Sequence, residues 1–387
     1  MWGFVTALND ILIPYLKNMF EFSNTQAQIV NFAFFGAFFV FALPSSKLIN
    51  KIGHQKSIVL ALVVIGLGAV LFYPAAAYHS FGFFLVALFV IASGITILQV
   101  SANPYVTELG PPEGASSRLN LAQGFNSLGT IIAPILGAEQ LLSSDPISGK
   151  ISGEAVQTPY VILGLSLILI AVFFAYAKLP KLSTSTVKST KSLKDFPHLI
   201  YGIIGIFFYV GAEVAIGSNI VFFLELDEIV GFTEQKAGKY VALYWGGAMV
   251  GRFIGAFLQT KYRPSKILFI AGIAACALVV IGMLGLGSFA MYSVLAIGFF
   301  NSVMFPTIFS LSVKGLGDYT NTGSGFLIMA IVGGALIPPL MGYLSTDSST
   351  GETSHLQLAF IVPLLCYIYI SFYALRAYKI KNIGQDE

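Results

Sequence analysis

Long apolar stretches recur along the whole chain, and they constrain its fold more than any other feature. With the window of about 19 residues that a membrane-spanning helix needs, the sequence contains twelve of them. They fall at 1–19, 27–49, 57–78, 81–107, 118–141, 157–178, 199–225, 238–260, 267–286, 289–313, 323–345 and 356–378. These stretches are too long and too continuously apolar for barrel strands, and open sheet edges cannot face lipid. The sequence therefore predicts an all-α integral membrane protein, which agrees with its 56% hydrophobic and 10% charged residues.

The basic residues indicate the orientation of these helices. If the amino terminus is cytoplasmic, sixteen Lys and Arg residues lie on the cytoplasmic side, and the four outside are Lys17, Lys150, Lys236 and Lys239. The positive-inside rule favours this orientation. We therefore predict a multi-pass protein of the bacterial inner membrane with both termini in the cytoplasm.

The chain is predicted to consist of two similar halves. Residues 179–198 are rich in Ser, Thr and Lys and form a predicted cytoplasmic linker between a six-helix half at 1–178 and another at 199–387. Three residues of the first half recur 210 positions later, because Gly36, Lys51 and Lys56 correspond to Gly246, Lys261 and Lys266. Two six-helix repeats are the architecture of alternating-access transporters, whose substrate site lies near the midplane between the repeats.

Two of the predicted helices carry bend signals. Gly129 precedes Pro134 in the fifth stretch, and Gly333–Gly334 precede Pro338–Pro339 in the eleventh. Such combinations interrupt or bend helices, so we expect bends at both places.

Asp10 is an acid inside the first apolar stretch, next to Asn9. A carboxylate in hydrocarbon costs roughly 2.5 to 3.5 kcal/mol on insertion scales, so such a residue normally faces a polar cavity or a bound cation. Asp10 is therefore a candidate for binding a coupling cation, and it is the candidate metal ligand if that cation is Na⁺. The alternative is that it reaches interfacial water at a helix end. The stretch has no basic amino-terminal region, so we expect a shortened first helix and no cleaved signal peptide.

Side-chain amides line two of the predicted helices. Gln99 and Asn103 are four residues apart, while Asn120, Gln123 and Asn126 are spaced by threes, so each set lies along one helical face. Amides both donate and accept hydrogen bonds without net charge, which suits an uncharged polyol. The alternative is hydrogen bonding between helices, which contributes about 0.6 kcal/mol per bond in membranes.

Several motifs together resemble one transporter family. They are LNDILIP at 8–14, QVSANPYVTELG at 99–110, RLNLAQGFNSLG at 118–129, FPTIFSL at 305–311 and IVGGALIPPLMG at 331–342. They resemble the fucose/glucose-galactose branch of the major facilitator superfamily, and the resemblance covers nearly the whole chain. It implies a twelve-helix fold of two pseudo-symmetric halves and the symport of a sugar with a cation. It also implies that Gln123 and Asn126 contact the sugar.

One position separates the types within that branch. The fucose permeases have a glutamate where this chain has Gln99, whereas glucose/galactose-type members have glutamine, so the resemblance favours a hexose carrier. Glutamine carries no proton, which leaves Asp10 as the main titratable candidate of the first half. The choice between Na⁺ and H⁺ stays open.

The second half contributes further candidates. Glu213 is a second intramembrane acid, at a position where the family usually has a neutral polar residue; it is a candidate for sugar binding, cation binding or protonation. Trp245 beside Gly246 is a candidate for stacking on a sugar ring, and Asn301 completes the predicted substrate set. Arg252 and Lys51 are candidate gating charges. Because Arg252 is placed towards the cytoplasmic end of its helix, we expect no ion pair between it and Glu213.

Other classes of function fit the sequence less well. There is no phosphate-binding Gly-x-x-x-x-Gly-Lys-Ser/Thr loop and no cluster of nucleophiles or metal ligands, so we expect a protein that is not an enzyme and needs no cofactor. The net charge of +3 comes without a polybasic block, so we expect no nucleic-acid partner. The predicted protein is a monomeric symporter of a hexose such as glucose or galactose with Na⁺ or H⁺. The alternatives are a facilitative sugar uniporter and a symporter of fucose or N-acetylglucosamine.

Overall fold

A computed structural model of the chain is entirely helical over the residues that it describes, which are 2–20, 24–141, 155–180, 192–346 and 355–378. Side chains at 9–11, 13–14, 17–18, 24–28, 134–141 and 378 also lie outside this description. Within it, ten helical segments are long and apolar enough to cross a membrane. The first and fifth apolar stretches correspond to α1 (Trp2–Phe20) and α6 (Ala115–Leu141). Each of the twelve predicted stretches therefore coincides with one helix or a pair of consecutive helices.

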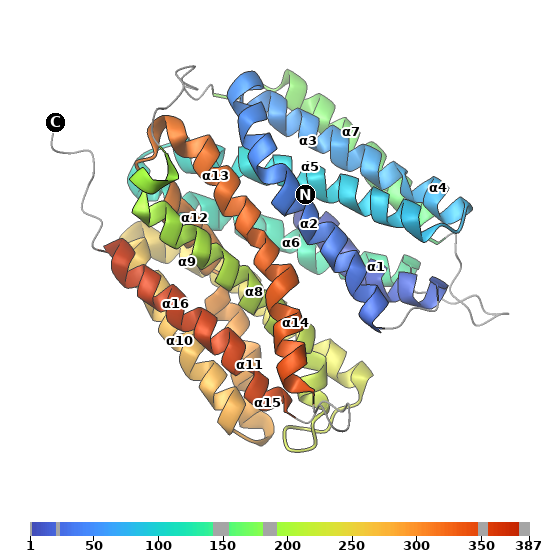
Figure 1. Ribbon diagram of the computed structural model, residues 1–387, viewed down its shortest axis with the longest axis vertical. Helices are drawn as coiled ribbons and strands as arrows, with labels where there is room; N and C mark the ends of the chain where they lie inside the picture. The colour runs from blue at the N-terminus through green and yellow to red at the C-terminus, as the bar shows by residue number, and fades with distance from the viewer. Residues whose placement is uncertain (1, 21–23, 142–154, 181–191, 347–354, 379–387) are drawn as a thin grey trace. The chain divides into compact units, whose positions relative to one another are not determined.

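The described helices fall into two compact units (Figure 1). The first unit comprises Met1–Tyr105, Phe125–Lys188 and Ser324–Met329, and the second comprises Val106–Gly124, Ser189–Gly323 and Ala330–Glu387. Both α6 and α13 (Thr320–Met329) are thus divided between the units. The division of the sequence at 179–198 stays a prediction.

The first unit is held together by close helix contacts. Besides α1 and part of α6, it contains α2 (Asn24–Ile52), α3 (His54–Val70), α4 (Phe72–Ala77), most of α5 (Phe81–Glu108) and α7 (Gln157–Tyr176). Helices α3 and α7 cross at two glycines, where a Cβ on Gly164 would lie 2.7 Å from the carbonyl oxygen of Gly66. Small residues at such a crossing let two membrane helices approach closely. One turn further along, the rings of Phe72 and Tyr160 stack with their centroids 4.1 Å apart.

The second unit is built around α8 (Pro197–Glu225). Helices α14 (Gly333–Ser345) and α16 (Ile361–Tyr378) run beside α8 (Figure 1). The unit also contains α9 (Glu234–Lys261), α10 (Pro264–Leu284), α11 (Gly287–Asn301), α12 (Met304–Val313) and α15 (Leu356–Ala359). Four 3-10 turns complete the described elements, namely η1 (Pro112–Gly114), η2 (Leu193–Asp195), η3 (Gly317–Tyr319) and η4 (Ala330–Val332).

Four of the membrane-spanning segments that the structure describes are interrupted, and two of these interruptions bear on the predicted bends and the site. The predicted bend before Pro338–Pro339 is confirmed, because the turn η4 separates α13 from α14 at Gly333. A second break separates α11 from α12 at Ser302–Val303, where the Ser302 hydroxyl donates to the carbonyl of Phe299 at 2.6 Å. By contrast, α6 is continuous from Ala115 to Leu141, and the bend expected after Gly129 stays a prediction.

Candidate functional site

Glu213 and Arg252 form a partly buried ion pair in the second unit. The Arg252 guanidinium lies 3.9 Å from the Glu213 carboxylate, and the two side chains are 13% and 14% exposed. The expectation that these residues would stay apart was therefore wrong. A charge that is largely removed from water is stabilised by a counter-charge and by hydrogen bonds, and this site provides both.

Tyrosine hydroxyls complete the surroundings of Glu213. Tyr209 lies one turn earlier on α8 and donates to the Glu213 carboxylate at 2.7 Å, as the spacing of four residues along a helix allows. Tyr244, on α9, donates to the Glu213 backbone carbonyl at 3.3 Å. The Asn301 amide in turn donates to the Tyr244 hydroxyl at 2.8 Å. We call these five residues, Tyr209, Glu213, Tyr244, Arg252 and Asn301, the α8–α9 polar cluster.

Arg252 also joins this cluster to the helix break. Its Nε donates to the carbonyl of Ser302 at 3.4 Å, and its Nη1 donates to the carbonyl of Gln123 at 3.5 Å. The last carbonyls of α11 have no partner within their own helix, and a guanidinium with five donors is well suited to them. Arg252, predicted as a gating charge, therefore contacts α8, the α11–α12 break and the segment of α6 in the second unit.

Trp245, on α9, packs against α8. Its ring is edge-on to Tyr244 at a centroid distance of 5.1 Å, and a Cβ on Gly217 would lie 3.1 Å from its indole. The indole is partly exposed. Its predicted stacking on a sugar remains a prediction.

A second polar network joins α6 to α9 and α12. The Asn120 amide donates to the Gln259 side-chain oxygen at 2.7 Å, and the Gln259 amide donates to the Thr307 hydroxyl at 2.7 Å. The hydroxyls of Ser116 and Ser310 lie 2.6 Å apart. Asn120 and Gln259 are both buried. Asn120 thus makes the interhelical hydrogen bonds that were the alternative to substrate binding.

The amides of the first unit lie on α5 and α6. Gln99 and Asn103 are buried on α5. Asn126 is partly exposed, and its side-chain oxygen accepts a hydrogen bond at 2.7 Å from the backbone N–H of Gly3, in the first turn of α1. Because the first N–H groups of a helix have no partner in that helix, Asn126 serves as a cap for α1. Gln123, in the second unit, is buried.

The remaining predicted residues are less defined. Asn9 and Asp10 lie within α1, and their side chains are outside the described part of the structure, so the predicted cation site stays a prediction. Lys51 is exposed in the last turn of α2. Sequence reasoning missed the roles of Tyr209 and Gln259. The only sequence signal for Tyr209 was its position one turn before Glu213, and for Gln259 it was an amide near the end of an apolar helix.

Comparison with known proteins shows which family the chain belongs to. The model of the Major Facilitator Superfamily matches residues 2–339, and the chain is a member of this superfamily of membrane transporters. It is 48% identical to a glucose/galactose transporter of Brucella abortus (strain 2308) over 384 residues, which covers 98% of this chain and 92% of that protein. It is 34% identical to the L-fucose-proton symporter of Escherichia coli (strain K12) over 399 residues, with 97% and 90% coverage.

A solved structure of a major facilitator superfamily transporter also matches this chain. The crystal structure of a major facilitator superfamily transporter, FucP, in the outward conformation matches with a TM-score of 0.86 and 33% identity, over 97% of this chain and 95% of that chain. The predicted all-α, twelve-helix major facilitator fold is thereby confirmed. The protein is a multi-pass membrane transporter and not an enzyme.

Proposed function

We propose that this protein is a secondary active transporter that moves a hexose such as glucose or galactose together with a cation. The observation that carries the proposal is 48% identity, over nearly the whole chain, to a protein named as a glucose/galactose transporter. Gln99 supports the hexose assignment, because an amide at this position resembles the glucose/galactose type. The inner-membrane location, the cytoplasmic termini and the monomeric state belong to the same proposal.

The sugar is bound by amides and aromatic rings in this proposal. Gln123 and Asn126 contribute from α6, and Gln99 and Asn103 from α5. Asn120 contributes least, since its amide is already bonded to Gln259. Uncharged amides exchange hydrogen bonds with sugar hydroxyls in both directions, so binding leaves few polar groups unpaired. Trp245 and Asn301 contribute from the second unit.

Asp10, assisted by Asn9, binds the coupling cation in this proposal. The E. coli relative is named as a proton symporter, which supports H⁺. Gln99 holds no proton, so we assign proton coupling to Asp10 and Glu213. If the ion is Na⁺ instead, the oxygen atoms of Asp10 and Asn9 are suitable ligands.

In this proposal Glu213, in the second half, contributes to coupling between cation and sugar. Its charge is balanced by Arg252, which also donates to carbonyls at the α11–α12 break. Protonation of Glu213 removes the attraction that holds Arg252 towards α8. A ligand shifts a conformational equilibrium only through different affinities for the two states, and this pair supplies one such difference.

The experiment is uptake of radiolabelled glucose into proteoliposomes that contain the purified protein. Uptake is measured under an inward Na⁺ gradient, an inward H⁺ gradient and no gradient. Accumulation above equilibrium under one gradient is the expected result, and it also identifies the ion. Equilibration to the same level in all three conditions would instead indicate a uniporter. If glucose gives no flux, the same assay with galactose, fucose and N-acetylglucosamine identifies the substrate.

A further inference from the structure

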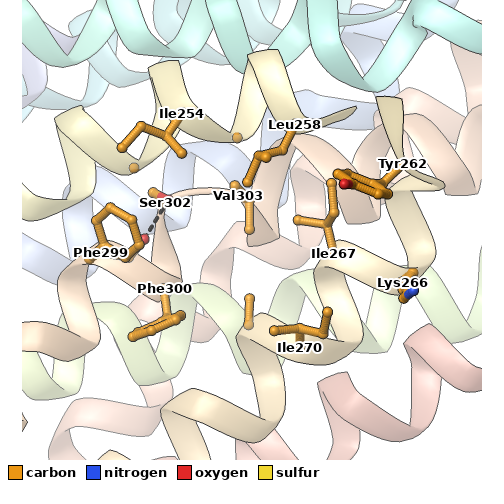
Figure 2. Close-up of a pocket in the computed structure, with 13 residues that line it drawn as sticks. Ile254, Leu258, Tyr262, Lys266, Ile267, Ile270, Phe299, Phe300, Ser302 and Val303 are labelled. Atoms are coloured by element: carbon orange, nitrogen blue, oxygen red, sulfur yellow. Dashed lines mark hydrogen bonds between the residues drawn. The ribbon is translucent and has the colours of Figure 1, made fainter. Parts of the chain in front are cut away.

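An apolar groove lies on the second unit, beside the helix break that Arg252 of the α8–α9 polar cluster contacts. It is bounded by α9, α10 and the α11–α12 break and has a volume of about 420 Å³ (Figure 2). Its walls are mainly aliphatic and aromatic, from Ile254, Leu258, Ile267, Ile270, Phe299 and Phe300. These side chains surround the groove from three sides in Figure 2. Its size is within the range of ligand sites, yet its lining offers few hydrogen bonds to a sugar.

The groove is open along helices that span the membrane. Ile254 is 42% exposed and Ile270 is 54% exposed, and both belong to segments apolar and long enough to cross a bilayer. At a rise of about 1.5 Å per residue, they lie on the order of 10 Å from the α9 and α10 ends joined by the short 262–263 connection. An apolar opening at this depth suits the acyl chains of the bilayer better than water.

One end of the groove carries a positive charge. Lys266, in the first turn of α10, is exposed and is the single charged residue in the lining. Among the residues that the structure describes, no carboxylate lies within ion-pair distance of its ammonium group. A neighbouring cavity that shares Tyr262 has mixed charge, since it is lined by Lys261 and Arg263 as well as Glu108 and Glu113.

This pattern complements one kind of molecule. An apolar channel in hydrocarbon with a lysine at its interfacial end is matched by an acyl chain that ends in an anionic headgroup. Basic residues at the cytoplasmic surface attract anionic lipids, and Lys266 is the basic residue at this end of the groove. We propose that the groove binds one acyl chain of an anionic phospholipid, with the lipid phosphate on the ammonium group of Lys266.

Such a lipid contacts the helix break directly. Ser302 and Val303 line the groove, and the carbonyl of Ser302 accepts a hydrogen bond from Arg252. Gly251 and Gly255 face this break from α9, where a Cβ would overlap the Ser302 and Val303 side chains. The acyl chain thus fills the space beside the break on the side away from Glu213. The inference depends on membrane insertion and is independent of which sugar is carried.

The test is native mass spectrometry of the full-length protein in detergent, titrated with phosphatidylglycerol or with phosphatidylcholine of the same acyl chains. Lys266→Gln removes the charge, and Lys56→Gln is the matched control, because Lys56 is the exposed lysine at the equivalent position of the first half. Ile270→Trp obstructs the groove, and Ile273→Trp is its control, since Ile273 is exposed on α10 and is not part of the lining.

We expect the unmodified protein to retain phosphatidylglycerol in preference to phosphatidylcholine. Lys266→Gln lowers the affinity for phosphatidylglycerol about fivefold, the size of effect that one basic residue near an anionic surface produces. It lowers phosphatidylcholine binding less, because the choline cation offsets the charge of the phosphate. Ile270→Trp lowers retention of both lipids, while both controls bind as the unmodified protein does. Equal retention of the two lipids by the unmodified protein, equal losses in Lys266→Gln and Lys56→Gln, or unchanged binding by Ile270→Trp would each overturn the proposal.

Discussion

The ion pair between Glu213 and Arg252 leads to a quantitative prediction about stability. Two unit charges about 4 Å apart interact by roughly 4 kcal/mol at the effective dielectric constant of about 20 that suits protein sites. At 3.9 Å and with side chains less than 15% exposed, this pair is in that range. The cost of removing both charges from water offsets most of this attraction. The pair therefore adds little net stability, whereas either charge alone is costly.

We therefore expect each single substitution, Glu213→Gln or Arg252→Gln, to lower the free energy of unfolding by about 3 kcal/mol, because it leaves one buried charge without its partner. The double variant should lose only about 2 kcal/mol, well below the sum of the two single losses, because the coupling free energy is the attraction of about 4 kcal/mol. Denaturant unfolding in detergent micelles measures all four proteins. The control is Lys56→Gln, an exposed lysine, whose effect should stay within about 0.5 kcal/mol. Additive effects of the two substitutions, within about 0.5 kcal/mol, would refute the reasoning.

Three further predictions concern other contacts. Gln259→Leu removes two interhelical hydrogen bonds among buried side chains, so it should lower the free energy of unfolding by about 1 to 3 kcal/mol in the same assay, and no change would contradict this. Asn126→Ala removes the cap of α1, which costs about 1 kcal/mol, and should also raise the sugar concentration for half-maximal uptake; an unaltered concentration dependence would argue against sugar contact. Gly164→Ala forces α3 and α7 apart and should reduce the thermal stability of the purified protein, whereas Gly36→Ala, where a Cβ meets open space, should not.

The helices of this fold follow from the sequence, because the backbone of a long apolar segment in hydrocarbon must satisfy its own hydrogen bonds, and a helix does so. The break before Gly333 was also predictable, since two glycines precede two prolines there. The break at Ser302–Val303 has only the signal of Pro306, which lacks the N–H that would bond the Ser302 carbonyl four residues earlier. The break is stabilised by a serine side chain and by Arg252 from another helix. Contacts of this kind depend on which helices are neighbours, and one sequence does not show that.

The pairing of Glu213 with Arg252 was missed for a related reason. Glu213 lies 16 residues after Pro197, the start of α8, and Arg252 lies nine residues before Lys261, the end of α9. At about 1.5 Å per residue these positions differ by roughly 10 Å in depth, which suggested separation. The arginine side chain is long, and its guanidinium closes that gap. Residue position along a helix is therefore a poor guide to the depth of an arginine head group.

Among the amides, the sequence predicted polar helix faces but not what each amide would contact. Asn120 and Asn126 lie six residues apart on α6, and the first bonds to Gln259 while the second accepts from Gly3. An asparagine suits sugar binding and contacts between helices equally well. Only the neighbouring helices decide between these uses, which is why Gln259 was not predicted as a partner.

The central claim is that Asp10 couples the cation to the sugar, and comparing two fluxes in one preparation tests it most directly. Proteoliposomes containing Asp10→Asn are measured for gradient-driven accumulation and for exchange of internal unlabelled sugar against external labelled sugar. Exchange needs sugar binding and alternating access without net cation movement, so it should persist, while accumulation above equilibrium is lost. Accumulation by Asp10→Asn equal to that of the unmodified protein would contradict the assignment of Asp10 as the coupling site.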